Sequence, residues 1–155
     1  MSIGKPVWTE ADFDQMNWHD ATVHGIAFRE EAGGADLLLD IDYIARWIEP
    51  VPPSEYFTFL VAPATLVFRD VWSIDGGLGT QRTLPQIDRI SRRDAQGEQQ
   101  AGSTLVWVVE GDVQLEFLAA GFRQHFRDHP ISAESQMLTL AQRGGISFAE
   151  PTHLP

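Results

Sequence analysis

The chain has 155 residues, and its 22 acidic and 11 basic side chains give a formal net charge of −11. This is the length of one ordinary domain, and a hydrophobic content of 43% with five Trp and nine Phe indicates a packed core rather than disorder. The absence of cysteine excludes a disulfide scaffold, a thiol nucleophile, a zinc ribbon and an iron–sulfur cluster.

The net charge and the N-terminal sequence indicate which partners and which cellular compartment to expect. A strongly acidic surface repels nucleic acid and anionic membrane, so neither is expected as a partner. No apolar run has the length of a signal peptide or of the roughly 20 residues that span a bilayer. We therefore expect a cytoplasmic protein, and the lack of cysteine agrees with that compartment.

The first elements are predicted from capping and from hydrophobic period. Thr9 and Asp12 form a capping box for a short helix over residues 10–16. From Asp20 onward the period is two, which predicts a strand over 21–29, a turn over 30–34 and a strand over 35–44. The second strand alternates Leu37, Leu39, Ile41 and Tyr43 with Asp36, Leu38, Asp40 and Asp42, a pattern typical of an antiparallel sheet with one wet face.

The middle of the chain is predicted as further strands. A proline-rich loop over 47–54 precedes two strands, 56–62 and 65–74, which Pro63 separates. The glycines of 75–82 indicate a loop, and the polar segment 83–92 is typical of an edge strand. Two alternating runs, 105–109 and 113–117, predict a hairpin that turns at Gly111-Asp112.

The C-terminal third is less clearly patterned. Residues 119–143 fit both strand and helix periods, and the choice between them stays open. Ser132 is a candidate cap for a helical segment that runs through Met137 to Arg143 and that Gly144-Gly145 would close, and 146–148 is a candidate last strand. Strands that follow one another without long helices argue against a parallel βαβ fold. We expect a single domain over 1–155 that is mainly β (α+β), an antiparallel sandwich or partly closed barrel with a short N-terminal helix and one C-terminal helix.

A binding surface is the first functional hypothesis. Asp36, Asp40 and Asp42 share one strand face and would present carboxylates to a basic partner; the alternative is an ordinary solvated face. Trp72 and Trp107 are in phase with core residues and are assigned to the core. Trp47, beside the proline-rich loop, is the better surface aromatic, unless it is a lid over one end of the core.

A metal site is the second hypothesis. His19, Asp20 and His24 lie within six residues at a helix–strand junction, and imidazole with carboxylate suits several divalent ions. Asp40 or Asp42 would approach this segment if the first two strands form a hairpin. The alternative is structural: a half-buried His24 bonded to a carbonyl, and Asp20 accepting amides in a turn. No cofactor is expected, and a divalent metal is kept as the alternative.

Catalytic motifs are absent from the sequence. There is no G-x-S-x-G, S-x-x-K or HExxH pattern, and the glycine clusters match neither a phosphate loop nor a dinucleotide fingerprint. A non-enzymatic protein is therefore favoured, one that binds a basic protein or a second copy of itself.

The motif Trp18-His19-Asp20 followed by His24-Gly25, with Leu38–Tyr43 and Ala62–Phe68, resembles small bacterial proteins of unknown function over roughly the first half of the chain. In size, acidity and class the chain is also similar to immunity proteins of polymorphic toxin systems. Such a resemblance implies binding to a toxin domain and supplies no catalytic residues.

Overall fold

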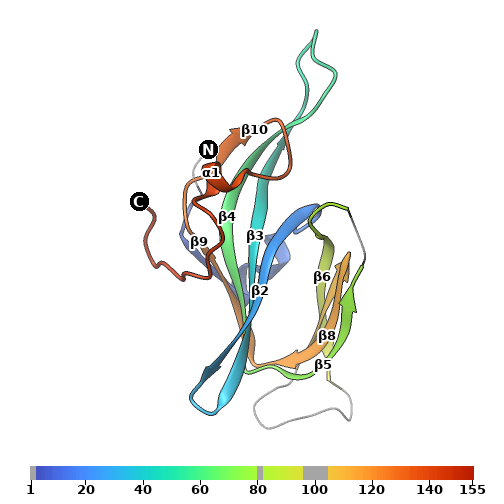
Figure 1. Cartoon of the computed structure of the whole chain (residues 1–155), viewed down its shortest axis with the longest axis vertical. Helices are drawn as coiled ribbons and strands as arrows, with labels where there is room; N and C mark the ends of the chain where they lie inside the picture. The colour runs from blue at the N-terminus through green and yellow to red at the C-terminus, as the bar shows by residue number, and fades with distance from the viewer. Residues whose placement is uncertain (1–2, 80–81, 96–104) are drawn as a thin grey trace.

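The computed structural model describes residues 3–79, 82–95 and 105–155. It is mainly β, as predicted (Figure 1). The strands are β1 (Val7–Thr9), β2 (Ala21–Glu31), β3 (Gly34–Ile48), β4 (Thr58–Arg69), β5 (Trp72–Leu78), β6 (Gln86–Asp94), β7 (Leu105–Gly111), β8 (Val113–Ala119), β9 (Gly121–Phe126) and β10 (Ile131–Ala133). The helical segments are the 3-10 helix η1 (Glu10–Gln15) and the single turn α1 (Leu140–Arg143).

All ten strands belong to one antiparallel sheet. Its order is β1-β9-β4-β3-β2-β6-β7-β8-β5, with β10 paired to the beginning of β4 at Phe59, Leu60 and Val61. The terminal strands β1 and β5 do not pair within the described residues, so the sheet is not closed into a barrel. It turns at the seam between β2 and β6, where only Ala21↔Ile87 and Thr22↔Gln86 are in register, and its two halves face each other as a sandwich (Figure 1).

The core lies between these two halves. Trp107 of β7 contacts Phe68 of β4 and Phe122 of β9 with ring centroids 5.5 and 5.3 Å apart, and all three side chains are buried. Edge-to-face packing of this kind suits the quadrupoles of aromatic rings. The core assignment of Trp107 is confirmed, whereas Trp72 is 39% exposed because β5 forms the end of the sheet, so its assignment to the core was wrong.

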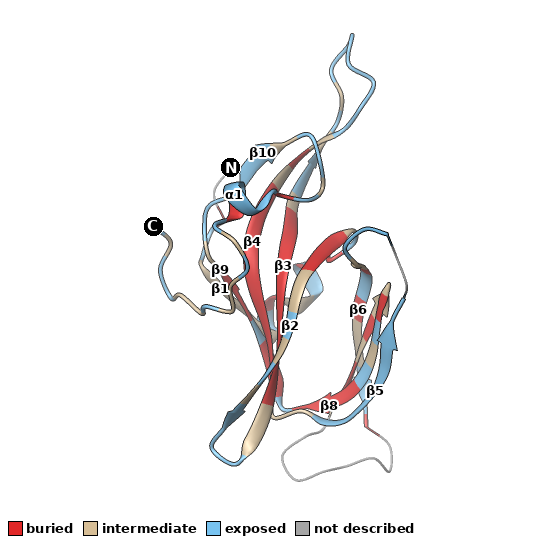
Figure 2. Cartoon of the chain, viewed as in Figure 1, coloured by how far each residue is buried: buried red, intermediate tan, exposed pale blue. Residues whose placement is uncertain are grey.

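Burial on both faces of β3 corrects the expectation of one wet face. Residues 36–44 are all buried, including every aspartate of the polar register (Figure 2). The outer face is covered by residues 138–150, which we call the C-terminal segment: the amides of Leu138 and Ser147 donate to carboxylates of β3. The alternating pattern correctly predicts a strand, but the second face of β3 is covered by the C-terminal segment, which is distant in sequence.

Pro63 does not separate two strands, because β4 runs through it. The Pro63 carbonyl accepts from the amide of Arg127, 2.9 Å away, so this residue directs its backbone polar groups toward β9 and β10. The register that pairs Ala64 with Phe126 places Pro63 opposite Arg127, one residue past the end of β9, so the missing N–H of proline removes a bond only where this pairing ends.

Two further expectations about the middle of the chain were wrong. Residues 75–78 are strand, not loop: Gly76 has φ 135°, and a Cβ there would lie 1.9 Å from the Gln114 carbonyl oxygen, so glycine permits the close approach of β5 to β8. Strand β6 lies between β2 and β7 rather than at an edge. Ile87 and Ile90 are buried, and the Arg92 guanidinium lies 4.5 Å over the Phe13 ring, whereas Asp88, Arg89, Arg93 and Asp94 are exposed.

The segment left open between strand and helix contains both. It begins as β9, continues through β10 and ends in α1, which Thr139 rather than Ser132 caps by accepting from the amide of Gln142. Gly144 closes α1 in the left-handed conformation, as predicted, but residues 146–148 are not a strand. The predicted N-terminal helix and the hairpin at Gly111-Asp112 are confirmed, the former as a 3-10 helix. No helix in the described parts of the chain has the length and apolar character needed to cross a bilayer.

Candidate functional site

A cluster of buried charges lies between β3 and the C-terminal segment. Asp40 and Asp42, on the outer face of β3, are both fully buried, as is the side chain of Arg143 at the end of α1. Both terminal nitrogens of Arg143 reach the Asp40 carboxylate, at 2.6 and 2.8 Å, and its Nε donates to Asp42 Oδ1 at 3.0 Å. One guanidinium therefore joins two carboxylates two residues apart on the strand.

Arg127 and His24 complete this cluster. Arg127, just after β9, donates to Asp40 Oδ1 at 2.6 Å and to the Thr65 hydroxyl at 2.8 Å. His24, on β2, has Nε2 only 2.7 Å from Asp42 Oδ2, and its side chain is 3% exposed. Two carboxylates thus face two guanidiniums and one imidazole, and we call these five residues (His24, Asp40, Asp42, Arg127 and Arg143) the buried charge cluster.

The ionisation of the buried charge cluster follows from its pairing. Burial alone would raise the pKa of Asp40, but hydrogen bonds from Arg143, from the Ser147 amide and from Arg127 outweigh it and hold that pKa below its usual value. Burial lowers the pKa of Arg127, and the Asp40 carboxylate opposes this change. For Arg143, burial is outweighed by its bonds to Asp40 and Asp42, and its pKa is raised. Both guanidiniums stay charged, because arginine starts from so high a value.

The predicted acidic binding face is not present at these positions. Asp40 and Asp42 have no exposed surface, and Asp36 is 8% exposed, with its carboxylate accepting from Arg29 and from the amide of Asp70. An ionised carboxylate leaves water only when it is paired, and each of these has an arginine partner within the chain. The cluster therefore holds the C-terminal segment on β3 rather than presenting charge to a partner.

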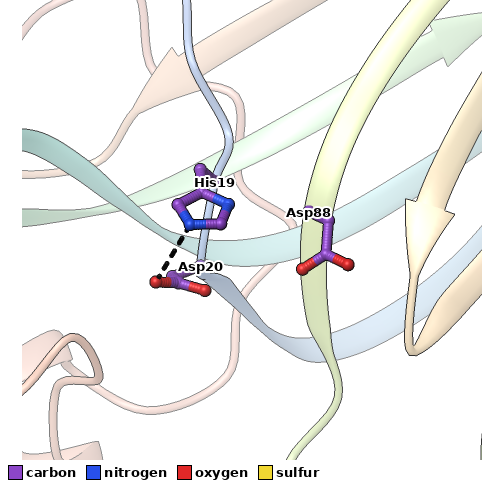
Figure 3. Close-up of side chains that lie close together, drawn as sticks. All are labelled: His19, Asp20 and Asp88. Carbon is purple, nitrogen blue, oxygen red and sulfur yellow. Dashed lines mark ion pairs between the residues drawn. The ribbon is translucent and has the colours of Figure 1, made fainter.

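The predicted metal ligands are divided between two places. His24 lies in the buried charge cluster, whereas His19 and Asp20 lie at the start of β2 beside Asp88 of β6 (Figure 3). One ligand atom from each of His19, Asp20 and Asp88 lies within 4.8 Å of the others. The Asp20 carboxylate also accepts from Gln136 at 2.7 Å, and its backbone has φ 63°, a left-handed conformation that aspartate tolerates.

Trp47 lies at the base of a projecting loop. Residues 49–57 join β3 to β4 and extend away from the rest of the molecule (Figure 1); we call them the β3–β4 arm. Trp47 is 38% exposed, packs edge-on against Phe57 and Phe59, and stacks on the His19 ring. It is therefore neither a buried core residue nor an isolated surface residue, but part of an aromatic group beneath the arm.

The partners that sequence reasoning missed are Arg127 and Arg143. Both lie far along the chain from β3, in the segment whose secondary structure the periodicity did not determine. One signal was present: Asp40 and Asp42 are adjacent on a strand face that also carries Leu38, and an apolar residue there is consistent with a covered face. No sequence pattern identifies which basic residues cover it.

Comparison with known proteins adds no further identification: no protein-family model, no curated protein and no solved structure matches this chain.

Proposed function

We propose that this protein is a non-enzymatic binding module that engages a basic protein partner through the β3–β4 arm. The observation that carries the proposal is the exposure of apolar side chains on a projecting loop: Val51 is 75% exposed, Tyr56 80% and Phe57 45%. Tyrosine and other aromatic side chains are enriched among residues that dominate binding energy at interfaces. Two exposed aromatic side chains and an exposed valine on a single projecting loop are typical of an interaction surface.

Charge supports a basic partner. The chain carries a net −11, and Glu49 and Glu55 lie on the arm itself. Complementary charge accelerates association and selects among partners. A basic toxin domain is one partner of this kind, in line with the likeness to immunity proteins, and a second copy of the chain is the less favoured alternative because its charge is also negative. The cytoplasm is the proposed compartment.

The test places a photo-crosslinking amino acid at position 56 in the cells that make the protein. The expected result is one discrete crosslinked partner, which is then purified and titrated with the protein in vitro. Tyr56→Ala should weaken that binding by at least tenfold, as expected for loss of an interface anchor. The matched control carries the crosslinker at Phe28, which is 63% exposed but lies at the opposite hairpin. The proposal fails if position 56 gives no discrete product, or if Tyr56→Ala leaves the affinity unchanged.

We infer a second candidate function, divalent-cation binding, from the grouping of His19, Asp20 and Asp88. Imidazole and two carboxylates form a ligand set suited to zinc or manganese. Calorimetric titration with Zn²⁺ should give one saturable site that Asp88→Asn removes. His24→Gln is the matched control and should leave the affinity for Zn²⁺ unchanged, because His24 lies in the buried charge cluster. Zn²⁺ binding that is unaffected by Asp88→Asn would contradict this assignment.

A further inference from the structure

A small cavity lies beside the buried charge cluster. Its volume is about 240 Å³, and the described residues that line it are His24, Leu84, Met137, Leu138, Thr139, Leu140 and Ile146. Among the described lining residues five are apolar, Thr139 carries a hydroxyl, and His24 is the one titratable side chain. A mainly apolar cavity with a few polar groups is the usual form of a small-molecule site, and sites for drug-sized ligands are larger, roughly 300–1,000 Å³.

The hydrogen bond to Asp42 fixes the tautomer of His24. Asp42 accepts from the Leu138 amide at 2.9 Å and from Nε of Arg143 at 3.0 Å. A carboxylate paired with a buried guanidinium acts as an acceptor, so the 2.7 Å contact requires His24 Nε2 to donate. In the neutral imidazole the other nitrogen, Nδ1, then carries no proton and is a hydrogen-bond acceptor.

Nδ1 has no partner in the described structure. His24 forms its one hydrogen bond through Nε2. The buried polar side-chain atoms that lack a partner are Thr22 Oγ1, Arg29 Nε, Trp107 Nε1, Gln124 Nε2 and His125 Nε2. Nδ1 of His24 is not among them, so it retains accessible surface although the side chain as a whole is 3% exposed. His24 is one of the residues that line the cavity.

From this geometry we propose that the cavity binds a small, mainly apolar molecule with one hydrogen-bond donor, such as a phenol or a short-chain alcohol, whose hydroxyl donates to Nδ1 of His24. The apolar side chains of the cavity bury the apolar part of the ligand, and Nδ1 of His24 favours ligands that carry a hydrogen-bond donor. A ligand that fits but has no donor leaves Nδ1 without a partner in an apolar site, which is unfavourable. This site is separate from the β3–β4 arm and from the His19–Asp20–Asp88 group.

Phenol and anisole test the proposal, because methylation of the oxygen removes the donor and leaves an aromatic ring of nearly the same size. The protein is labelled with ¹⁵N and titrated with each compound in the presence of EDTA. We expect phenol to shift the amide resonances of residues 138–140 and the Nδ1 resonance of His24 saturably. We expect anisole to bind about tenfold more weakly, the difference one hydrogen bond makes.

The matched variant is His24→Lys, whose ammonium can still donate to Asp42 but carries no acceptor. It should bind phenol and anisole equally. A second variant, Leu84→Trp, fills the cavity from a residue that is 41% exposed and should abolish both titrations while the fold survives. Equal binding of phenol and anisole by the native protein, a preference for phenol that survives in His24→Lys, or binding that survives in Leu84→Trp would each overturn the proposal. So would the absence of any saturable shift. None of these outcomes bears on the crosslinking at Tyr56.

Discussion

Asp42 is a single carboxylate whose partners come from three distant parts of the chain: His24 of β2, the Leu138 amide and Arg143 of α1. Replacing such a buried charge by a neutral group leaves the opposite charge without a partner in a low-dielectric site. The resulting loss of folding stability is larger than the net stability that the ion pair contributes. Asp42 therefore stabilises the fold by compensating the cost of burying the polar and charged groups that bond to it.

Asp42→Asn tests this role. It should lower the free energy of unfolding by about 3–5 kcal/mol, because Arg143 stays fully buried with one carboxylate fewer. The measurement is urea unfolding at neutral pH. The control, Glu110→Gln, removes a surface pair with Arg89, whose partners are 44% and 70% exposed, and should cost less than about 1 kcal/mol. Equal losses in the two variants would contradict the argument.

The depressed pKa of Asp40 predicts the direction of acid unfolding. A carboxyl whose folded-state pKa lies below its unfolded value stabilises the fold above the unfolded value, about 3.9. That contribution is lost as the pH falls from this value through the folded-state pKa. The free energy of unfolding should therefore fall below about pH 4. Asp40→Asn should flatten this fall over the same range, and an unchanged pH profile in the variant would refute the assignment.

At the scale of elements, the C-terminal segment depends on the turn that ends α1. Gly144 has φ 73°, and the amides of Gly144 and Gly145 both donate to the Leu140 carbonyl. This turn redirects the chain from α1 back across β3, where the Ser147 amide reaches Asp40. The left-handed conformation of Gly144 therefore does two things: it ends α1, and it turns the chain back across β3.

Gly144→Ala should lower the free energy of unfolding by about 1–2 kcal/mol through backbone strain alone, since a Cβ at this position meets nothing within 4 Å. Gly4→Ala is the matched control: its Cβ also meets nothing within 4 Å, and no positive φ is recorded there. Thermal unfolding of both variants measures the difference. Equal stability of the two variants would show that the left-handed turn carries no strain.

The hairpins and caps of this fold were predictable because their signals are local. The turn after β2, the turn at Gly111-Asp112 and the capping box at Thr9 each lie within a few residues of the element they define. The errors at Gly76, Pro63 and β6 have a common cause: each depends on what lies beside the strand in the sheet. Strand pairing between distant segments leaves no pattern in a single sequence.

The candidate sites divide in the same way. The proximity of His24 and Asp42 was foreseen, because a hairpin brings neighbouring strands together. The burial of Asp40 and Asp42 was not, since it depends on Arg127 and Arg143 from a segment of ambiguous period. His19 and Asp20 were named as ligands, but their neighbour Asp88 lies across the seam between β2 and β6.

At the scale of the whole molecule, the two halves of the sheet are joined by a seam of two residue pairs but share one aromatic core. Trp107 extends from β7 against Phe68 and Phe122 of the other half, and Phe68 also packs on Phe117 of β8 with ring centroids 4.8 Å apart. Because so little backbone pairing joins the halves, their cooperation depends on this packing. The halves should therefore unfold together, in one transition.

Trp107→Ala tests whether the core couples the halves. Truncation of a fully buried tryptophan should lower the free energy of unfolding by about 3–5 kcal/mol. In the native protein, circular dichroism and tryptophan fluorescence should give the same urea midpoint, the sign of a two-state transition. Trp72→Ala, at a side chain 39% exposed on β5, is the matched control and should cost much less. If circular dichroism and fluorescence give different urea midpoints in the native protein, the two halves unfold independently and the shared core does not couple them.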